Sequence, residues 1–184
     1  MDPPWPNRSA QRRADYPLMP DMYDLFALPL KALCQEDAVV GIWCTNAVKH
    51  WHFLLEKYLP AHQLTPFAIW WWIKVDTHGK MVMPLDARHR HPYEGILFAR
   101  YYAQKQEKQK DAKPEKLTAH FFFSPVARRH SAKPDIVPLL RREGLWNDDT
   151  DALDLFARSL RPQTINWGNE PFSLRLYPTC EDTS

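Results

Sequence analysis

Glycine is scarce in this chain of 184 residues, where five glycines stand against seventeen prolines. The imbalance predicts many stiff loop segments. No GxGxxG motif is present, which argues against a dinucleotide-binding fold of the usual kind. No stretch reaches the roughly 18 apolar residues of a membrane span, and no signal-peptide pattern is found. From these absences we expect a soluble, intracellular protein.

Cysteine is also rare, and its placement excludes two further classes of protein. Cys34, Cys44 and Cys180 have no C-x-x-C spacing and are odd in number. This argues against a disulfide framework or a zinc ribbon and fits a reducing compartment. The triplet His89-Arg90-His91 has no third ligand at a suitable spacing, so we interpret it as a basic substrate loop. We therefore expect no metal site.

The formal net charge is only +2, but the positive charge is unevenly placed. Basic residues gather in five clusters, at Arg8–Arg13, Arg88–His91, Lys105–Lys116, Arg128–His130 and Arg141–Arg142. Such clusters suit a polyanionic partner, although for any single cluster an ordinary solvated surface is the favoured interpretation. The almost wholly polar run 104–116 indicates a charged surface loop between strands.

Apolar runs alternate with amphipathic segments, which predicts an α/β protein with its sheet covered on both faces. Helices are expected at Met22–Leu28, Ala47–Leu59 and Asp135–Arg142. Strands are expected at Val39–Cys44, Phe67–Val75, Gly95–Tyr101, Leu117–Phe123 and Ala152–Ala157, with a sixth at Phe172–Leu176. Ligands of such sheets bind at the carboxyl ends of strands, so Asp154–Arg158 is a natural cofactor site.

The run Trp70-Trp71-Trp72 has two interpretations. Three adjacent indoles could form a stacking platform for bases. Strand alternation, however, sends Trp70 and Trp72 to one face of the sheet and Trp71 to the other, which favours packing in the core.

The tetrapeptide Asp2-Pro3-Pro4-Trp5 is suited to hold an exocyclic amine. The prolines fix φ at about −65° and lack an N–H, so their carbonyls are expected to face outward as acceptors. Asp2 adds a carboxylate, and Trp5 offers a ring on which a base can stack. Two acceptors that grip both N–H bonds of an adenine N6 amine would make it pyramidal and nucleophilic. Pro-Pro beside Trp is also a common loop breaker, so the rest of the chain must decide.

Several motifs in a fixed order along the chain carry a family resemblance. They are DPPW at 2–5, WCTN at 43–46, HSAKP at 130–134, and DLFAR with WGNE at 154–158 and 167–170. Together they resemble the eukaryotic DPPW-type adenine-N6 methyltransferases, the family of the messenger-RNA adenosine methyltransferase catalytic subunit. The segments 84–100 and 153–170 look most like the branch called methyltransferase-like protein four. The resemblance implies a Rossmann-like fold in permuted motif order, S-adenosyl-L-methionine as cofactor, RNA or alternatively DNA as substrate, and a nuclear location.

The resemblance also implies a site. Asp2 with the carbonyls of Pro3 and Pro4 would hold the target amine, and Trp5 would shape the base pocket. Tyr16 and Glu94 match positions that border the acceptor base. The cofactor-binding positions are Asp2, Lys133, Asp154, Arg158, Asn169 and Glu170. Among these, Lys133 would pair with the methionine carboxylate, while Arg158, Asn169 and Glu170 would bind the ribose and adenine.

Two departures from the family pattern matter. Family members carry an apolar strand immediately before DPPW, whereas only Met1 precedes Asp2 here. We therefore expect a single methyltransferase domain over residues 1–184 that lacks this central strand and is incomplete at its N-terminus. Ala132 stands where the family usually has His. The main hypothesis is an active adenine-N6 methyltransferase. The alternative is an inactive nucleic-acid-binding or scaffolding relative, or a fragment completed by a partner chain.

Overall fold

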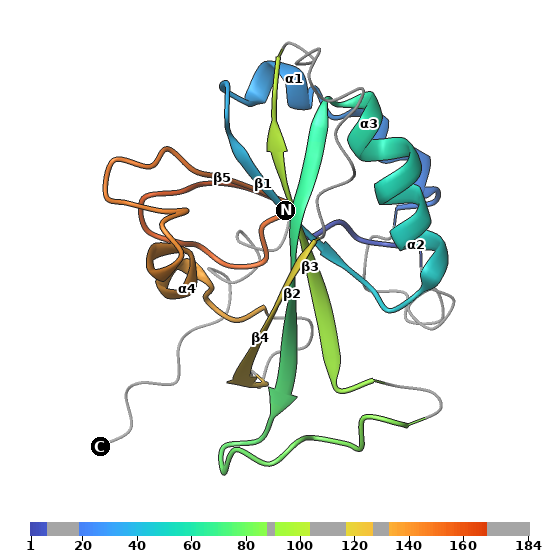
Figure 1. Cartoon of the computed structure of the whole chain (residues 1–184), viewed down its shortest axis with the longest axis vertical. Coiled ribbons are helices and arrows are strands. Elements are labelled where there is room, and N and C mark those ends of the chain that lie inside the picture. The colour runs from blue at the N-terminus through green and yellow to red at the C-terminus, as the bar shows by residue number, and fades with distance from the viewer. Residues whose placement is uncertain (7–18, 88–90, 104–116, 127–132, 169–184) are drawn as a thin grey trace, which may run out of the picture. The chain divides into compact units, whose positions relative to one another are not determined.

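A computed structural model describes residues 1–6, 19–87, 91–103, 117–126 and 133–168 (Figure 1). The chain divides into two compact units. The larger unit is Pro3–Val126, and the smaller unit combines Met1–Asp2 with Ala127–Ser184. No helix in the described ranges is long and apolar enough to cross a membrane.

A four-stranded sheet in the order β1-β3-β2-β4 forms the centre of the larger unit. Its strands are β1 (Val39–Cys44), β2 (Leu64–Val75), β3 (Tyr93–Tyr101) and β4 (Thr118–Pro125). β3 is antiparallel to both β1 and β2, whereas β4 is parallel to β2. The α/β class is confirmed, and the four strands predicted between residues 39 and 123 are all found in this sheet. The sheet is nevertheless mixed, because it combines the antiparallel pairs of β3 with the parallel pair of β2 and β4.

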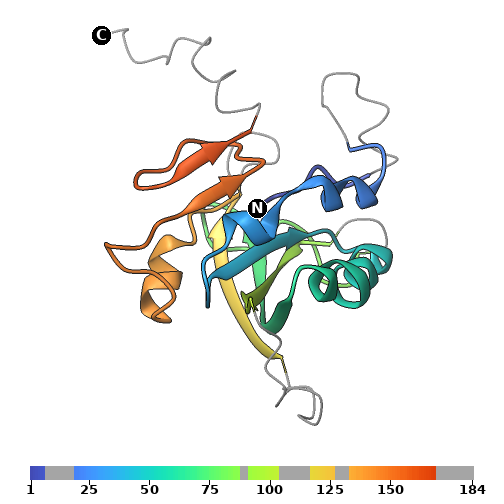
Figure 2. The ribbon, with the colours of Figure 1, turned by 90° about the horizontal axis from the view of Figure 1, so that it is seen from above.

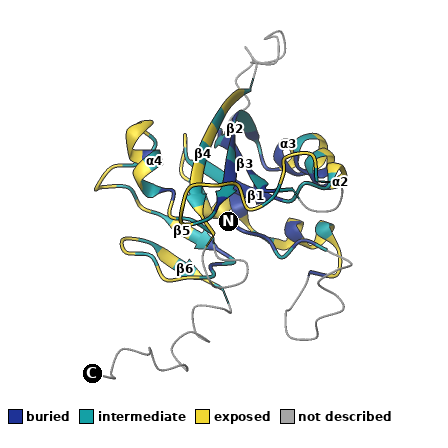
Figure 3. Ribbon diagram, turned by 90° about the horizontal axis from the view of Figure 1, so that it is seen from below, coloured by how far each residue is buried: buried dark blue, intermediate teal, exposed yellow. Residues whose placement is uncertain are grey.

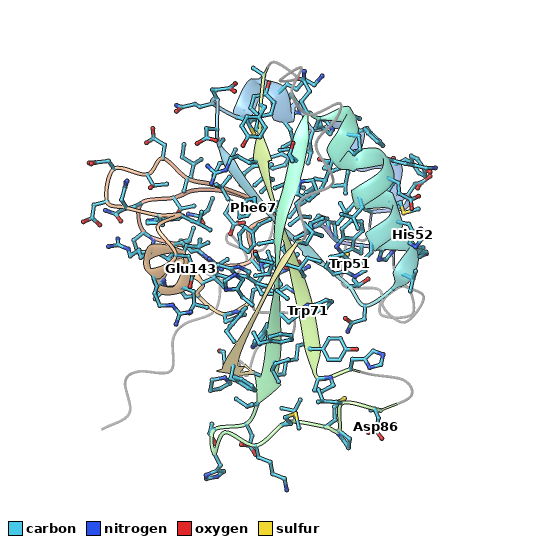
Figure 4. All side chains as sticks on the ribbon, viewed as in Figure 1. Trp51, His52, Phe67, Trp71, Asp86 and Glu143 are labelled. Atoms are coloured by element: carbon cyan, nitrogen blue, oxygen red, sulfur yellow. The ribbon has the colours of Figure 1, made fainter. Side chains whose placement is uncertain are left out.

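The tryptophans of β2 confirm the core interpretation. Trp70 and Trp72 are 3% and 2% exposed, and they lie on the same face of the sheet. Trp71, on the other face, packs against Trp51 with ring centres 5.5 Å apart (Figure 4). Gly95 lies beneath this pair, and a Cβ on it would be 2.5 Å from the Trp51 ring. The glycine is therefore needed for Trp51 to reach the sheet.

Helical segments pack beside the sheet of the larger unit (Figure 1). The predicted helix Ala47–Leu59 is found as three consecutive segments, α2 (Val48–His52), the π-helical η2 (Phe53–Tyr58) and α3 (Leu59–Ala61). The apolar residue Val48 is 68% exposed on this helix, whereas the polar His50 is buried. The predicted helix Met22–Leu28 is the short 3-10 helix η1 (Met22–Ala27), and α1 (Leu30–Leu33), which was not predicted, follows it.

β4 is covered less than the other strands of its sheet. Its residues alternate between exposed and intermediate burial, and the side chains of Phe121 and Phe123 are 65% and 67% exposed (Figure 3). The expectation of a sheet covered on both faces is therefore wrong at this strand, within the residues that the structure describes.

The smaller unit contains α4 (Val137–Arg142) and a parallel pair of short strands, β5 (Leu153–Leu155) and β6 (Ile165–Trp167) (Figure 2). The predicted strand Ala152–Ala157 is shorter than expected because Phe156 adopts a left-handed φ of 61°, which turns the chain. β6 was not predicted, and the strand expected at Phe172–Leu176 lies outside the described residues.

Candidate functional site

Asp2 is the centre of a charged cluster in the smaller unit. Its backbone N–H donates to the carbonyl of Leu155, 3.2 Å away, at the carboxyl end of β5. Arg158 Nε lies 2.5 Å from Asp2 Oδ2, and Lys133 Nζ lies 3.7 Å from Oδ1. All three side chains are no more than 15% exposed. The structure thus brings together three of the residues that the family resemblance assigns to the cofactor.

The local backbone explains how Arg158 reaches Asp2. The left-handed turn at Phe156 ends β5, and the N–H of Ala157 donates to the carbonyl of Trp167 on β6 at 3.0 Å. Gly168 is required here, since a Cβ would stand 2.5 Å from the Ala157 carbonyl oxygen. The turn directs the chain so that Arg158 follows at the strand's carboxyl end, the edge predicted to bind ligands.

Asp154 is held by a different partner, which sequence reasoning missed. Its Oδ2 lies 4.0 Å from Nε of Arg161. Arg161 Nη1 lies 3.8 Å from Asp135, and Arg161 also donates to the Pro134 carbonyl at 3.4 Å. Arg161 therefore ties the end of β5 to the segment that follows Lys133. Nothing in the local pattern distinguishes this arginine from the solvated ones.

Trp5 belongs to the larger unit, where it is only 5% exposed. Its indole N–H donates to the Trp43 carbonyl at 2.9 Å. One face of the ring stacks on His50, with centres 4.7 Å apart and planes 20° apart, and Phe53 approaches edge-on at 6.4 Å. The ring face toward His50 is thus covered by protein, and the indole is anchored to β1 through the Trp43 carbonyl.

His50 is the functional candidate in this unit that sequence reasoning missed. Its Nδ1 lies 2.6 Å from the hydroxyl of Thr45, and burial, with a smaller contribution from Lys49, lowers its pKa to about 4. The ring is therefore neutral at physiological pH. The signal available in the sequence was the spacing of His50 with Leu54 and Tyr58, which repeats every four residues along one helix face.

The two proline carbonyls already accept backbone hydrogen bonds. The Pro3 carbonyl accepts from the N–H of Trp5 at 2.8 Å, and the Pro4 carbonyl accepts from the N–H of Met19 at 3.1 Å. Pro3 itself is fully buried. The expectation that both carbonyls face outward is not met, although a carbonyl oxygen has a second lone pair that can accept another donor.

Glu94 lies on β3 and forms an ion pair with Lys74 of β2. Lys74 Nζ also lies 5.0 Å from the ring centre of Trp72. Glu94 is therefore held at the sheet, and its role beside a base stays a prediction. Tyr16, Asn169, Glu170 and the charged run 104–116 lie outside the described residues. Within the described ranges, no group of His, Cys, Asp and Glu side chains could hold a metal ion.

Comparison with known proteins gives a consistent result. The profile of the MT-A70 family matches residues 1–170. Human N(6)-adenine-specific methyltransferase METTL4 is 31% identical over 173 residues, which cover 92% of this chain and 36% of that protein. The Caenorhabditis elegans DNA N6-methyl methyltransferase is 32% identical over 95% of this chain and 45% of its own length.

A third relative is named for RNA. The N6-methyladenosine RNA methyltransferase MTA1 of Pyricularia oryzae is 29% identical over 92% of this chain and 45% of its own length. The chain therefore spans less than half the length of these three relatives.

Proposed function

Because the chain belongs to the MT-A70 family, we propose that it transfers a methyl group from S-adenosyl-L-methionine to the N6 amine of adenine in a nucleic acid. RNA is the proposed substrate and DNA the alternative, since relatives are named for each. The observation that carries the proposal is the Asp2 carboxylate, buried between Arg158 and Lys133 at the carboxyl end of β5.

The charged cluster fits the amino-acid part of the cofactor. That part has a carboxylate and an ammonium group, which need a cation and an anion as partners. Lys133 is the proposed cation and Asp2 the proposed anion. Arg158, which pairs with Asp2 in the structure, is proposed to bind the ribose and adenine together with Asn169 and Glu170. When bound, S-adenosyl-L-methionine supplies an electrophilic methyl group on a sulfonium.

The protein's contribution to the reaction is to bind and orient the amine. The Asp2 carboxylate accepts a hydrogen bond from an N–H group of the amine, and the remaining lone pairs of the Pro3 and Pro4 carbonyls are further acceptors. Positive charge develops on the amine as the methyl group arrives, and the negative charge of Asp2 stabilises it. Most of the rate enhancement then comes from positioning, which supplies up to about 7–11 kcal/mol in favourable cases.

Calorimetry of the full chain with S-adenosyl-L-methionine tests the proposal. We expect measurable binding that is lost in Lys133→Glu and kept in Lys31→Glu, a matched charge reversal on α1 of the larger unit. Transfer of a labelled methyl group to single-stranded RNA and DNA then identifies the substrate. Absence of cofactor binding in the parent chain would contradict the proposed enzymatic function and favour an inactive, nucleic-acid-binding relative.

Two further properties belong to the proposal. We place the protein in the nucleus, which fluorescence microscopy of a tagged full-length protein would check. We also propose that a partner subunit completes the enzyme. Activity of the isolated chain equal to that of the chain purified with associated proteins would contradict this second point.

A further inference from the structure

A groove of about 460 Å³ opens on the larger unit between η1 and the helical segment α2–η2. Tyr23 lines it from η1, Val48 and Lys49 from α2, and Phe53 and Lys57 from η2. Every one of these except Phe53 is exposed to solvent. Nothing in the proposed chemistry of methyl transfer uses this groove.

The groove is connected to the tetrapeptide through ring contacts. Phe53 is 2% exposed and forms the inner wall of the groove. On one side Phe53 meets Tyr23 at 5.1 Å, and on the other it meets Trp5 at 6.4 Å. His50, which stacks on Trp5, lies on the same helix between Lys49 and Phe53. The ring of Phe53 would therefore lie between a ligand in the groove and Trp5.

The groove combines flat apolar surface with positive charge. Tyr23 is 42% exposed and Val48 is 68% exposed, so both offer surface to a planar ligand. Lys57 Nζ donates to the Tyr23 hydroxyl at 2.5 Å and lies 5.1 Å from the centre of its ring. Lys49 is exposed at the same groove. Aromatic rings bind bases of any sequence, and lysines bind phosphates.

One acidic side chain in the groove reduces the positive charge of the two lysines. Glu56 lines the groove and pairs with His52 at 3.0 Å, both side chains being 63% exposed. His52 is labelled on α2 in Figure 4, at the outer side of the helix. The two lysines therefore outnumber the single carboxylate, and removal of the carboxylate should help an anionic ligand.

We propose that this groove binds the single-stranded nucleic acid that flanks the target adenine, with bases against Tyr23 and Val48 and phosphates on Lys49 and Lys57. The proposal rests on the proposed methyl transfer to a nucleic acid. It assigns the groove to backbone and stacking contacts, which predicts affinity without strong sequence preference.

Fluorescence anisotropy with a labelled 12-nucleotide single strand tests the proposal on the full chain. The double variant Lys49→Glu/Lys57→Glu should weaken binding at least about tenfold. It should also reduce the slope of log affinity against log salt by about 1.4, since each phosphate contact to a single strand contributes about 0.7. Lys31→Glu, an exposed lysine of α1 that does not line the groove, is the control.

Three further variants separate effects on stacking and charge from a general loss of folding. Tyr23→Ala should weaken binding about tenfold, whereas Tyr23→Phe, which keeps the ring, should bind within about twofold of the parent. Glu56→Gln should tighten binding about twofold, an improvement that a damaged fold would not produce. Equal effects of the groove variants and Lys31→Glu, or unchanged binding in all of them, would overturn the groove assignment.

The methyl-transfer proposal is judged separately. Cofactor binding by calorimetry should be unchanged in every groove variant, because none of these residues lies in the Asp2 cluster. If the parent chain binds the cofactor and methylates the strand while the groove variants behave like the parent, only the groove assignment fails. If the parent chain binds no cofactor, the proposed function itself fails.

Discussion

The two ends of the tetrapeptide are held in opposite ways. Asp2 is held by charge, between the side chains of Arg158 and Lys133 in the smaller unit. Trp5 is held by packing in the larger unit, against His50 and Phe53 and with its N–H on a backbone carbonyl. Ionic partners can be exchanged for those of a ligand, whereas a buried indole cannot leave without opening a cavity. We therefore expect the Trp5 end to stay packed in the larger unit, and the Asp2 end to be the one that can exchange its partners for a ligand.

The largest expected effect breaks the packed end. Trp5→Ala should lower the free energy of unfolding of the larger unit by about 3–5 kcal/mol, because it removes a buried aromatic ring and leaves a cavity. Denaturant unfolding followed by circular dichroism measures the change. Trp167→Ala, at a ring that is 56% exposed, is the control and should change stability far less. A Trp5→Ala protein as stable as the parent would mean that the ring does not anchor the tetrapeptide.

The second effect breaks the charged end. Asp2→Asn keeps the shape of the side chain and one oxygen acceptor but removes the charge that stabilises the developing cation. We expect the rate of methyl transfer to fall by a factor of about 10² to 10³, with binding of single-stranded nucleic acid largely kept. Single-turnover assays and anisotropy measure the two quantities. Asp148→Asn, which removes a 76% exposed carboxylate from the same unit, should retain activity. Activity of Asp2→Asn within tenfold of the parent would remove the charge from the mechanism.

The smallest expected effect is on the pH dependence of stability, through His50, which packs against Trp5. Burial lowers the pKa of His50 from 6.5 to about 4, so the unfolded chain takes up a proton at a higher pH than the folded protein does. The contribution of His50 to stability is therefore present above about pH 6.5 and is lost as the pH falls toward 4. Thermal unfolding between pH 7 and pH 4.5 should show a steeper loss in the parent than in His50→Phe. The other histidines, including His62, are unchanged between the two proteins, and parallel curves would show that His50 does not titrate in this way.

Much of the local structure was predictable because apolar periodicity reports burial. β1 has the predicted bounds, Val39–Cys44, and the tryptophan run of β2 alternates as expected. The pairing of strands was not predictable in this way, since periodicity says which residues are buried but not which strand is the neighbour. The antiparallel direction of β3 and the pairing of the short strand β6 with β5 are seen only in the folded chain.

The residues of the candidate site were likewise predictable only in part. The motif order pointed to Asp2, Lys133 and Arg158, and the structure brings these three together. It did not point to His50 or Arg161, whose partners come from other segments of the chain. A lone His on an apolar helix face has no chemical signature until the fold shows the ring on which it stacks.

The sequence by itself determined the family, the class of fold and the residues that carry charge at the Asp2 end, because these depend on residue types in a fixed order. Only the tertiary structure decided that Trp5 is buried and that the carbonyls of Pro3 and Pro4 already accept backbone donors. The physical reason is that a motif specifies which groups are present. Whether a ring or a carbonyl faces solvent depends on what the rest of the chain packs against it.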